Sequence, residues 1–261
     1  LTELSSGTNI QVGVATHSPY FVRPEQFSSL RRFSVHGNES SYKSTSLAAV
    51  AAKVGKNTED VHKVVAKHLP TEFSEGFFSD KVILVEGDTD KCVIEALAER
   101  RSTPLDAYGT SILQMGGKSN LRVPYAILSA LGVPVYVIVD GDSQRSLRKH
   151  PVGSREQLDA LASHRAQTEE AISWLPGATG AGASFGAATM SHNDFTLWND
   201  DIEAELETWQ SFVDELQNAG GQIRSKKMAH YRAASQAADL TAIPSTVTEC
   251  LDSIERFATT T

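Results

Sequence analysis

Three short, largely apolar segments, each followed by a turn and a helix-like stretch, constrain the fold more than any other feature of the sequence. They cover residues 81–85, 110–115 and 134–139. Apolar runs of this length are typical of strands buried on both faces, as in parallel sheets whose crossover helices cover both sides. Repetition of the strand–turn–helix unit therefore predicts an α/β fold with an open parallel sheet flanked by helices.

Apolar periodicity predicts further elements around these units. Between residues 44 and 69 it predicts two helices, the second capped at Asn57, which form a small helical accessory domain. The other predicted helices cover residues 144–175, 199–219, 226–238 and 245–257, and the other predicted strands cover 10–15 and 195–198. A Gly/Ala tract at 176–186 predicts a mobile loop, because small side chains bury too little surface to offset a chain entropy of ~1–2 kcal/mol per residue.

Composition narrows the class of protein. Hydrophobic residues make up 40% of the 261 residues and charged residues 21%, which is typical of a soluble globular protein and not of a disordered or coiled-coil chain. The sequence has no apolar run of the ~18–20 residues that a membrane helix requires, so we expect no membrane partner. Cys92 and Cys250 lie too far apart in sequence to form a metal-binding pair, which fits a reducing, cytoplasmic location.

Acidic residues follow two of the predicted strands directly. Glu86 ends the first strand and Asp140 the third, while Asp90 and Asp142 lie in the turns that follow. Because ligands of open α/β sheets bind beyond the carboxyl ends of the strands, we expect these four side chains to meet. Close carboxylates repel one another unless cations neutralise them, and oxygen ligands favour Mg²⁺ or Mn²⁺. The alternative interpretation is that each acid only caps the following helix.

The formal net charge of −8 raises the question whether such a site could act on a nucleic acid. A chain with this charge lacks the excess of Lys and Arg that gives proteins nonspecific affinity for duplex DNA. Cations held by carboxylates would reverse the local charge, so an acidic composition does not exclude a nucleic-acid substrate.

The same acidic residues carry a family resemblance. Val85-Glu86-Gly87 at a strand end, followed by Val139-Asp140-Gly141-Asp142, resembles the Toprim signature, and the flanking Gly117-Lys118-Ser119 resembles the version found in OLD (overcoming lysogenization defect) nucleases. The resemblance covers residues 80–230. It implies a Toprim-type sheet and a metal-dependent endodeoxyribonuclease that hydrolyses DNA with two divalent cations, Mg²⁺ or Mn²⁺ with Ca²⁺ as a further choice. The implied core ligands are Glu86, Asp90, Asp140 and Asp142, with Glu86 also in a catalytic role.

The resemblance also implies functional residues outside this core. Glu203, with Asp201 beside it, matches an acidic helix start that supplies ligands to a second cation, although a solvated acidic helix face would give the same pattern. A downstream catalytic lysine corresponds to Lys226 or Lys227, and spacing favours Lys227. Lys118 lies on a Gly-rich turn that either holds a DNA phosphate or is only a tight turn.

The segment Thr16-His17-Ser18-Pro19 resembles the switch that ends an ABC-type ATPase domain in OLD proteins, with His17 at the position that senses nucleotide. The remainder of such a domain is absent, because Ile112 occupies the first glycine position of a P-loop around Gly117-Lys118-Ser119. We therefore expect ATP to act only in a full-length protein, which would be a homodimer formed through its N-terminal ATPase domain. The predicted organisation is an ATPase remnant over 1–22, a helical connecting segment over 23–78, a Toprim domain over 79–230 with a helical insertion and mobile loop near 144–190, and C-terminal helices over 231–261.

Two other functions stay open from the sequence. The strand that ends in Asp140-Gly141-Asp142 also resembles the nucleophile strand of haloacid-dehalogenase-like phosphatases, but Gln144 occupies the position where that family has Thr or Val. A Toprim domain that has lost catalysis could bind DNA or a partner protein without cutting. Such a domain would be expected to lack a carboxylate, and all four core acids are present.

Overall fold

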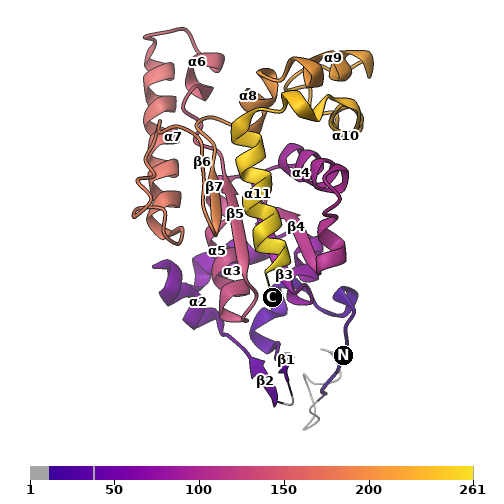
Figure 1. Cartoon of the computed structure of the whole chain (residues 1–261). Helices are drawn as coiled ribbons and strands as arrows, with labels where there is room; N and C mark the ends of the chain where they lie inside the picture. The colour runs from indigo at the N-terminus through magenta and orange to yellow at the C-terminus, as the bar shows by residue number, and fades with distance from the viewer. Residues whose placement is uncertain (1–11, 38, 261) are drawn as a thin grey trace.

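The structure, a computed structural model, describes residues 12–37 and 39–260. A five-stranded sheet lies at its centre, with the strand order β4-β3-β5-β7-β6 (Figure 1). The strands are β3 (Lys81–Val85), β4 (Thr110–Gln114), β5 (Val135–Val139), β6 (Met190–Ser191) and β7 (Phe195–Leu197). Neighbouring strands are parallel except for β6 and β7. The predicted open parallel sheet is therefore confirmed, and β6 adds a short antiparallel edge that the sequence pattern did not predict.

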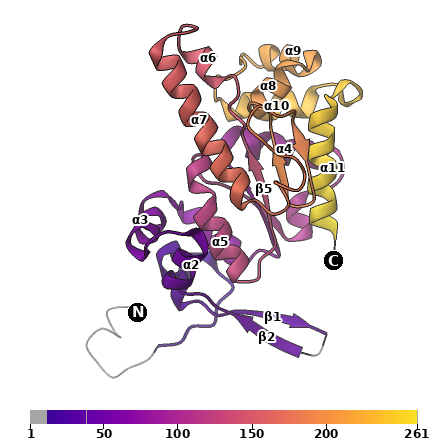
Figure 2. The same ribbon diagram turned by 90° about the vertical axis from the view of Figure 1, so that its left-hand side faces the viewer.

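Helices cover both faces of this sheet (Figure 2). They are α2 (Leu47–Val54), α3 (Thr58–His68), α4 (Asp88–Arg100), α5 (Arg122–Ala130), α6 (Arg145–Lys149), α7 (Arg155–Trp174), α8 (Ile202–Glu207), α9 (Gln210–Asn218), α10 (Met228–Ala237) and α11 (Ser245–Thr259). Val82 and Leu84 share one hydrophobic core with α2, α3, α5 and α7, whereas Ile83 and Val85 share the other with α4 and α8 to α11. Because successive strand residues point to opposite faces, both faces of β3 are covered, and its residues after Lys81 are all apolar and buried.

The predicted helices at 44–69 are confirmed as α2 and α3. The Ser46 hydroxyl accepts a hydrogen bond from the amide of Ala49 and so caps α2, and Gly55 ends that helix in the left-handed region at φ 65°. Asn57 Oδ1 accepts a 2.8 Å bond from the amide of Asp60, as expected for the cap of α3. None of the described helices has both the length and the apolarity that crossing a membrane requires.

The N-terminal part differs from the prediction in two respects. The predicted strand at 10–15 is wrong for residues 12–15, which have no regular structure, while residues 10 and 11 lie outside the described part of the chain. Within the segment 23–78, expected to be helical, an antiparallel hairpin joins β1 (Arg32–His36) to β2 (Glu39–Lys43). Since every residue of β2 is exposed, the hairpin has no buried face that an alternating apolar pattern could reveal.

Helix boundaries in the second half also differ from the prediction. The polar stretch at 144–175 divides into α6 and α7, and the predicted helix at 199–219 divides into α8 and α9 with a break at Thr208 and Trp209. Trp209 is fully buried at this break. The helix expected from residue 226 begins at Met228, so Lys226 and Lys227 precede α10.

The Gly/Ala tract after α7 is a series of packed turns. The amide of Ala181 bonds the carbonyl of Gly177 at 2.9 Å, and the amide of Ala183 bonds that of Ala178 at 3.0 Å. Ala178 is fully buried in the core on the α7 side of the sheet, and the Arg165 guanidinium lies 5.1 Å from the ring centre of Phe185. Ala178 therefore packs against the core, whereas most other residues of the tract are exposed. The mobility of this tract stays a prediction.

Candidate metal centre

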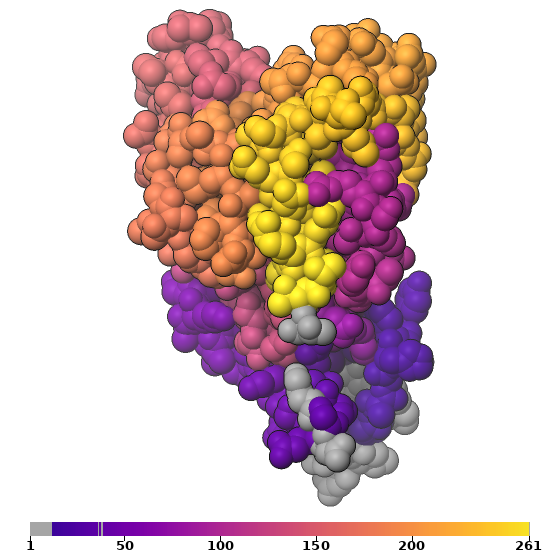
Figure 3. Space-filling view, in the orientation of Figure 1, coloured from indigo at the N-terminus to yellow at the C-terminus, as the bar shows by residue number. Residues whose placement is uncertain are grey.

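Acidic residues from several elements meet where the parallel strands end. The turns after β3, β5 and β7 supply Glu86, Asp140 and Asp201, and the first turns of α4 and α8 supply Asp90 and Glu203. All five line a cleft of about 490 Å³. The cleft lies between α6 on one side and α10 on the other, at the notched end of the molecule in Figure 3. Of the four acids expected to meet, Glu86, Asp90 and Asp140 share this cleft, whereas Asp142 is not among its lining residues.

Gly141 allows the ends of β5 and β7 to approach closely. A Cβ at this residue would lie 2.2 Å from the carbonyl oxygen of Asn199 and 2.4 Å from that of Trp198. Backbone bonds join the same segments, from the Trp198 amide to the Val139 carbonyl at 2.9 Å and from the Asp142 amide to the Asp200 carbonyl at 2.9 Å. The glycine between the two aspartates therefore holds the acids of β5 against those of β7.

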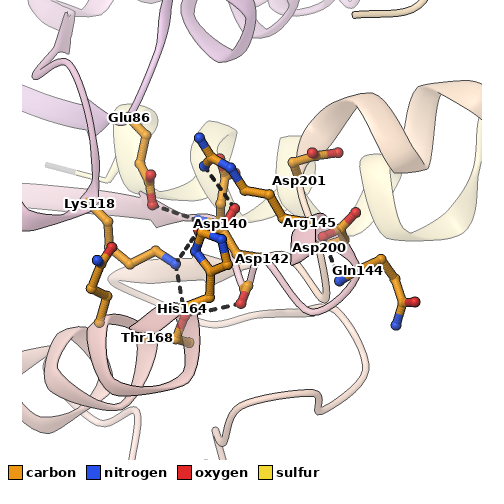
Figure 4. Close-up of polar contacts among 12 residues, drawn as sticks. Glu86, Lys118, Asp140, Asp142, Gln144, Arg145, His164, Thr168, Asp200 and Asp201 are labelled. Carbon is orange, nitrogen blue, oxygen red and sulfur yellow. Dashed lines mark hydrogen bonds and ion pairs between the residues drawn. The ribbon is translucent and has the colours of Figure 1, made fainter. Parts of the chain in front are cut away.

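Glu86, Asp90 and Asp140 form the acidic half of the cleft and have few protein partners. Glu86 accepts a 2.9 Å hydrogen bond from the backbone amide of Asp140 (Figure 4), whereas the buried Oδ1 atoms of Asp90 and Asp140 have no hydrogen-bond partner among the described residues. Burial chiefly, and then neighbouring carboxylates, raise the pKa of Asp90 and of Asp140 well above the ordinary range. Burial likewise raises the pKa of Glu86 to about 7, although Lys118 opposes this shift. Charged carboxylates here are therefore costly without a cation.

Asp142, the fourth predicted ligand, is neutralised by side chains of the protein itself. Its Oδ2 lies 2.8 Å from Lys118 Nζ and its Oδ1 lies 3.0 Å from Arg145 Nη1. Burial would raise the pKa of Asp142, but Lys118 and Arg145 lower it below the ordinary value. Its backbone has φ 54°, which is uncommon outside glycine. Asp142 does not line the cleft, so a role as a cation ligand would require it to leave these partners.

Lys118 is placed differently from the sequence-based expectation. Its side chain is only 3% exposed, and its ammonium donates to Asp142 and, at 2.8 Å, to the Thr168 hydroxyl. Thr168 in turn donates to the carbonyl of Gly141 at 3.0 Å. Contact with a DNA phosphate is not supported by this arrangement, because the ammonium faces the interior; Lys118 instead joins the turn after β4 to α7 and to the turn after β5.

We expect Lys118→Met to lower the free energy of unfolding by about 2–4 kcal/mol, because it leaves Asp142 buried with only Arg145 as a charged partner. Urea unfolding monitored by circular dichroism measures this change. Lys149→Met, which removes an exposed lysine at the cleft, is the matched control and should change stability by less than about 0.5 kcal/mol. Equal stabilities of the two variants would contradict the ion-pair role, and adding Asp142→Asn to Lys118→Met should restore part of the loss.

Asp200 and Asp201 also bind cationic side chains. Arg148 of α6 contacts both, with Nη2 at 2.8 Å from Asp201 Oδ2, and Arg224 contacts Asp201 from the opposite side. Asp201 Oδ1 accepts from the Ala204 amide at 2.9 Å and caps α8. Since both oxygens of Asp201 are engaged, its predicted role as a ligand to a second cation is weaker than that of Glu203.

The remaining predicted residues are distributed unevenly about the site. Glu203 lines the cleft, and so does Lys226, whereas Lys227 is not among the lining residues. Both lysines are exposed, and the helix expected to orient them begins only at Met228. His17 is exposed in the N-terminal segment and does not contribute to the cleft.

Sequence reasoning missed the basic residues of the cleft other than Lys226. Arg145 and Arg148, together with Lys149, come from α6, and Arg224 comes from the turn before α10. A signal was present for the first group, because cations at spacings of three and four residues directly follow the Asp140-Gly141-Asp142 turn and share one helix face. For Arg224 no local signal existed, since its partner Asp201 is 23 residues away in the chain.

The acidic half of the cleft fits a divalent cation by the chemistry of its donors. Hard carboxylate oxygens with buried, unpartnered atoms are provided by Asp90 and Asp140, and Glu86 lies beside them. Within residues 12–37 and 39–260, no three His, Cys, Asp or Glu side chains form a group that could hold a metal ion as they stand. Cation binding would therefore require these carboxylates to draw together.

Comparison with known proteins bears on the same segment. Residues 77–142 match the family model of the overcoming lysogenization defect protein-like TOPRIM domain. This segment matches the OLD-like Toprim family. It contains Glu86, Asp90, Lys118, Asp140 and Asp142. The family resemblance stated from the sequence is therefore confirmed over this segment, while the roles of these residues stay predictions. Glu203 and the basic residues of α6 and of the turn before α10 lie outside the matched segment.

Relatives extend the comparison beyond the Toprim segment. The chain is 31% identical over 93 residues to "Endonuclease GajA" of Bacillus cereus (strain HuB5-5), which covers 36% of this chain and 13% of that protein. Among solved structures, the C-terminal region of the Xanthomonas campestris pv. campestris OLD protein is similar with a TM-score of 0.42 and 17% identity, covering 70% of this chain and 96% of that one. The C-terminal region of the Burkholderia pseudomallei OLD protein gives a TM-score of 0.42 and 17% identity, covering 69% and 99%.

Proposed function

We propose that this chain is the catalytic region of a metal-dependent DNA endonuclease. The observation that carries the proposal is the composition of a single cleft, which joins carboxylates with unpartnered buried oxygens to a set of exposed basic side chains. Carboxylates that cannot be neutralised by the protein favour a cation, and basic side chains beside them favour a phosphate. One site thus offers both a place for the cations that assist phosphodiester hydrolysis and basic side chains that attract the negative charge of the phosphate.

Glu86, Asp90 and Asp140 would hold the first cation, and Glu203 would supply a ligand to a second. Mg²⁺ or Mn²⁺ bound there would activate water and stabilise the leaving oxygen. Arg145, which lies between Asp142 and the cleft, would offset negative charge on the phosphate in the transition state. Lys226 would serve the same purpose from the opposite wall of the cleft, and the spacing-based choice of Lys227 stays a prediction.

The choice of DNA as substrate rests on the relatives. The Toprim segment matches an OLD-like family, and the relative from Bacillus cereus is named an endonuclease. The matched part spans about 13% of that relative's length, so we propose for this chain the hydrolytic step alone. Control by ATP, an N-terminal ATPase domain and homodimer formation through it are proposals for a longer protein.

A nicking assay on supercoiled plasmid tests the proposed function. We expect nicked product with Mg²⁺ or Mn²⁺ in the absence of ATP, and none after EDTA is added, because the proposed mechanism relies on the cations to activate water and to stabilise the leaving oxygen. Cleavage that persists in EDTA would overturn the metal-dependent assignment. Hydrolysis of p-nitrophenyl phosphate with an intact plasmid would instead support the phosphatase alternative, and metal-independent DNA binding without cleavage would support a non-catalytic module.

A further inference from the structure

Part of the lining of the cleft is basic. Its members are Arg145, Arg148 and Lys149 of α6, and Arg224 and Lys226 of the turn before α10. Basic side chains from α6 and from the turn before α10 thus line the same cleft from opposite sides. Their number exceeds what Asp200 and Asp201 require as ion-pair partners, since Lys149 and Lys226 have no ion pair within the described chain.

Arg148 and Arg224 are held in place by shared acceptors. Both contact Asp201 Oδ2, Arg148 also contacts Asp200 Oδ2, and Arg224 Nη2 lies 4.0 Å from that same Asp200 oxygen. Each arginine side chain stays about 30% exposed and lines the cleft. A guanidinium has five N–H donors in a planar fork, so donors remain for a further anion after these contacts. Because the guanidinium groups are already fixed, an incoming phosphate need not order them, which lowers the entropy cost of binding.

The backbone that presents Arg224 and Lys226 is strained. Arg224 has φ 66° and Lys226 has φ 51°, and non-glycine residues in this region typically cost about 1–3 kcal/mol each. The amide of Arg224 donates to the Tyr231 hydroxyl at 2.7 Å, and Tyr231, a residue of α10, is fully buried. An ion pair that only stabilised the fold would not need two strained cationic residues, separated by one residue, at the cleft. Strain of this kind is typical of a binding site.

We infer that Arg148 and Arg224 form a subsite for a backbone phosphate of the DNA strand next to the phosphate that is cut, with Lys149 beside them. This inference rests on the proposed function, since it assumes that the phosphate to be cut lies at Glu86 and Asp140. The subsite recognises phosphate and therefore binds without regard to base sequence. Asp200 and Asp201 act in it as positioning residues, because they hold the two guanidinium groups at a fixed separation.

The test measures DNA affinity and its salt dependence in an Asp140→Asn background, where cleavage does not interfere. Fluorescence anisotropy of a labelled duplex oligonucleotide is recorded over a series of NaCl concentrations in Mg²⁺. We expect Arg148→Met and Arg224→Met each to weaken binding by about tenfold or more and to reduce the slope of log affinity against log salt by about 0.9, the value for one lost phosphate contact. Arg232→Met, which removes an arginine paired with Glu99 outside the cleft, is the matched control.

A charge-neutral double variant separates contact from net charge. Arg224→Met combined with Asp201→Asn removes one charge of each sign and leaves the net charge unchanged. If Arg224 acts only through the net charge of the protein, the double variant should bind DNA with the affinity of the parent. A direct phosphate contact would stay lost, with the lower slope retained. If Arg224→Met does not fold, as shown by thermal melting, the Lys149→Met variant, at an exposed residue of the same subsite, should also lower the slope.

A small substrate distinguishes failure of this inference from failure of the proposed function. Thymidine 5′-(p-nitrophenyl phosphate) has one phosphodiester and no neighbouring phosphate. The substitution Arg224→Met, made in the otherwise unsubstituted chain, should lower kcat/KM for both substrates to different extents. We expect the fold-decrease for DNA to be at least ten times the fold-decrease for this small substrate. Equal losses on both substrates, or slopes equal to the Arg232→Met control, would overturn the subsite. Absence of hydrolysis of any substrate by the parent would overturn the proposed function, while the salt dependence would still report on the subsite.

Discussion

The Asp140→Asn variant is expected to lose DNA cleavage by at least about a thousandfold and, without metal, to be more stable than the parent chain. Loss of a charged ligand weakens cation binding and leaves water without activation, so catalysis falls by orders of magnitude. In the metal-free protein the same substitution removes a buried charge beside Glu86 and Asp90. We expect a gain of about 1–3 kcal/mol in the free energy of unfolding at pH 8. Plasmid nicking and thermal melting in EDTA measure the two effects.

The gain in stability should depend on pH in a defined direction. The pKa of Glu86 rises on folding from 4.5 to about 7, chiefly through burial, and that of Asp140 rises for the same reason. A group whose pKa is higher in the folded state contributes stability that is fully present below its unfolded pKa and is lost as the pH rises through its folded pKa. The metal-free parent should therefore lose stability between about pH 4.5 and 7, and the advantage of Asp140→Asn should be smaller at pH 5 than at pH 8.

An acid outside the cleft provides the control for both effects. Asp159→Asn alters a side chain on α7 that is 76% exposed and lies 3.7 Å from Arg155, and it should leave nicking and melting unchanged. If Asp140→Asn unfolds, or melts below the parent at pH 8 in EDTA, then Asp140 has a structural role and the charge-repulsion argument is wrong.

Gly141→Ala is expected to destabilise the protein by about 3 kcal/mol or more. A methyl group there would collide with the backbone carbonyls of Trp198 and Asn199, which cannot move without breaking the connection between β5 and β7. If the variant still folds, the strand ends must separate, so cation binding by Glu86, Asp140 and Glu203 should weaken. Urea unfolding measures the stability, and calorimetric titration with Mn²⁺ measures the affinity.

Gly180→Ala is a suitable comparison for this substitution. Its Cβ would make only an ordinary 3.6 Å contact with the Gly177 carbonyl oxygen, and its backbone does not lie in the left-handed region. We expect a stability change below about 0.5 kcal/mol. Similar behaviour of the two alanine variants would mean that the close approach at Gly141 can relax at little cost.

Features that depend on local pattern were predictable from the sequence. The apolar runs that became β3 and β5 are buried on both faces, and parallel pairing then places Glu86 and Asp140 at the same edge of the sheet. Asn57 capped the helix that its sequence context indicated. These predictions held because strand burial, strand-end position and helix capping are each determined within a few residues.

Features that depend on distant partners were not predictable. Lys118 turned away from the expected phosphate because its partners Asp142 and Thr168 lie 24 and 50 residues further along the chain. The β1–β2 hairpin carries Phe33 and Tyr42 on an exposed surface, so its residues show no alternation of buried and exposed positions. In both cases the outcome depends on contacts between residues far apart in the sequence, or on the lack of such contacts, and local sequence patterns do not predict these.

The Toprim match ends at Asp142, and the first basic residue of the cleft lining, Arg145, follows three residues later in the chain. The carboxylates that would hold the cations follow strands of the central sheet or lie in the first turns of α4 and α8, which pack against it. The basic residues proposed to contact the substrate belong to α6 and to the turn before α10, neither of which is part of that sheet. Substitutions in these two segments can therefore retune substrate preference while the sheet and its carboxylates stay as they are. For protein engineering, α6 and residues 222–227 are therefore the first segments to diversify when the substrate preference of the chain is to be changed.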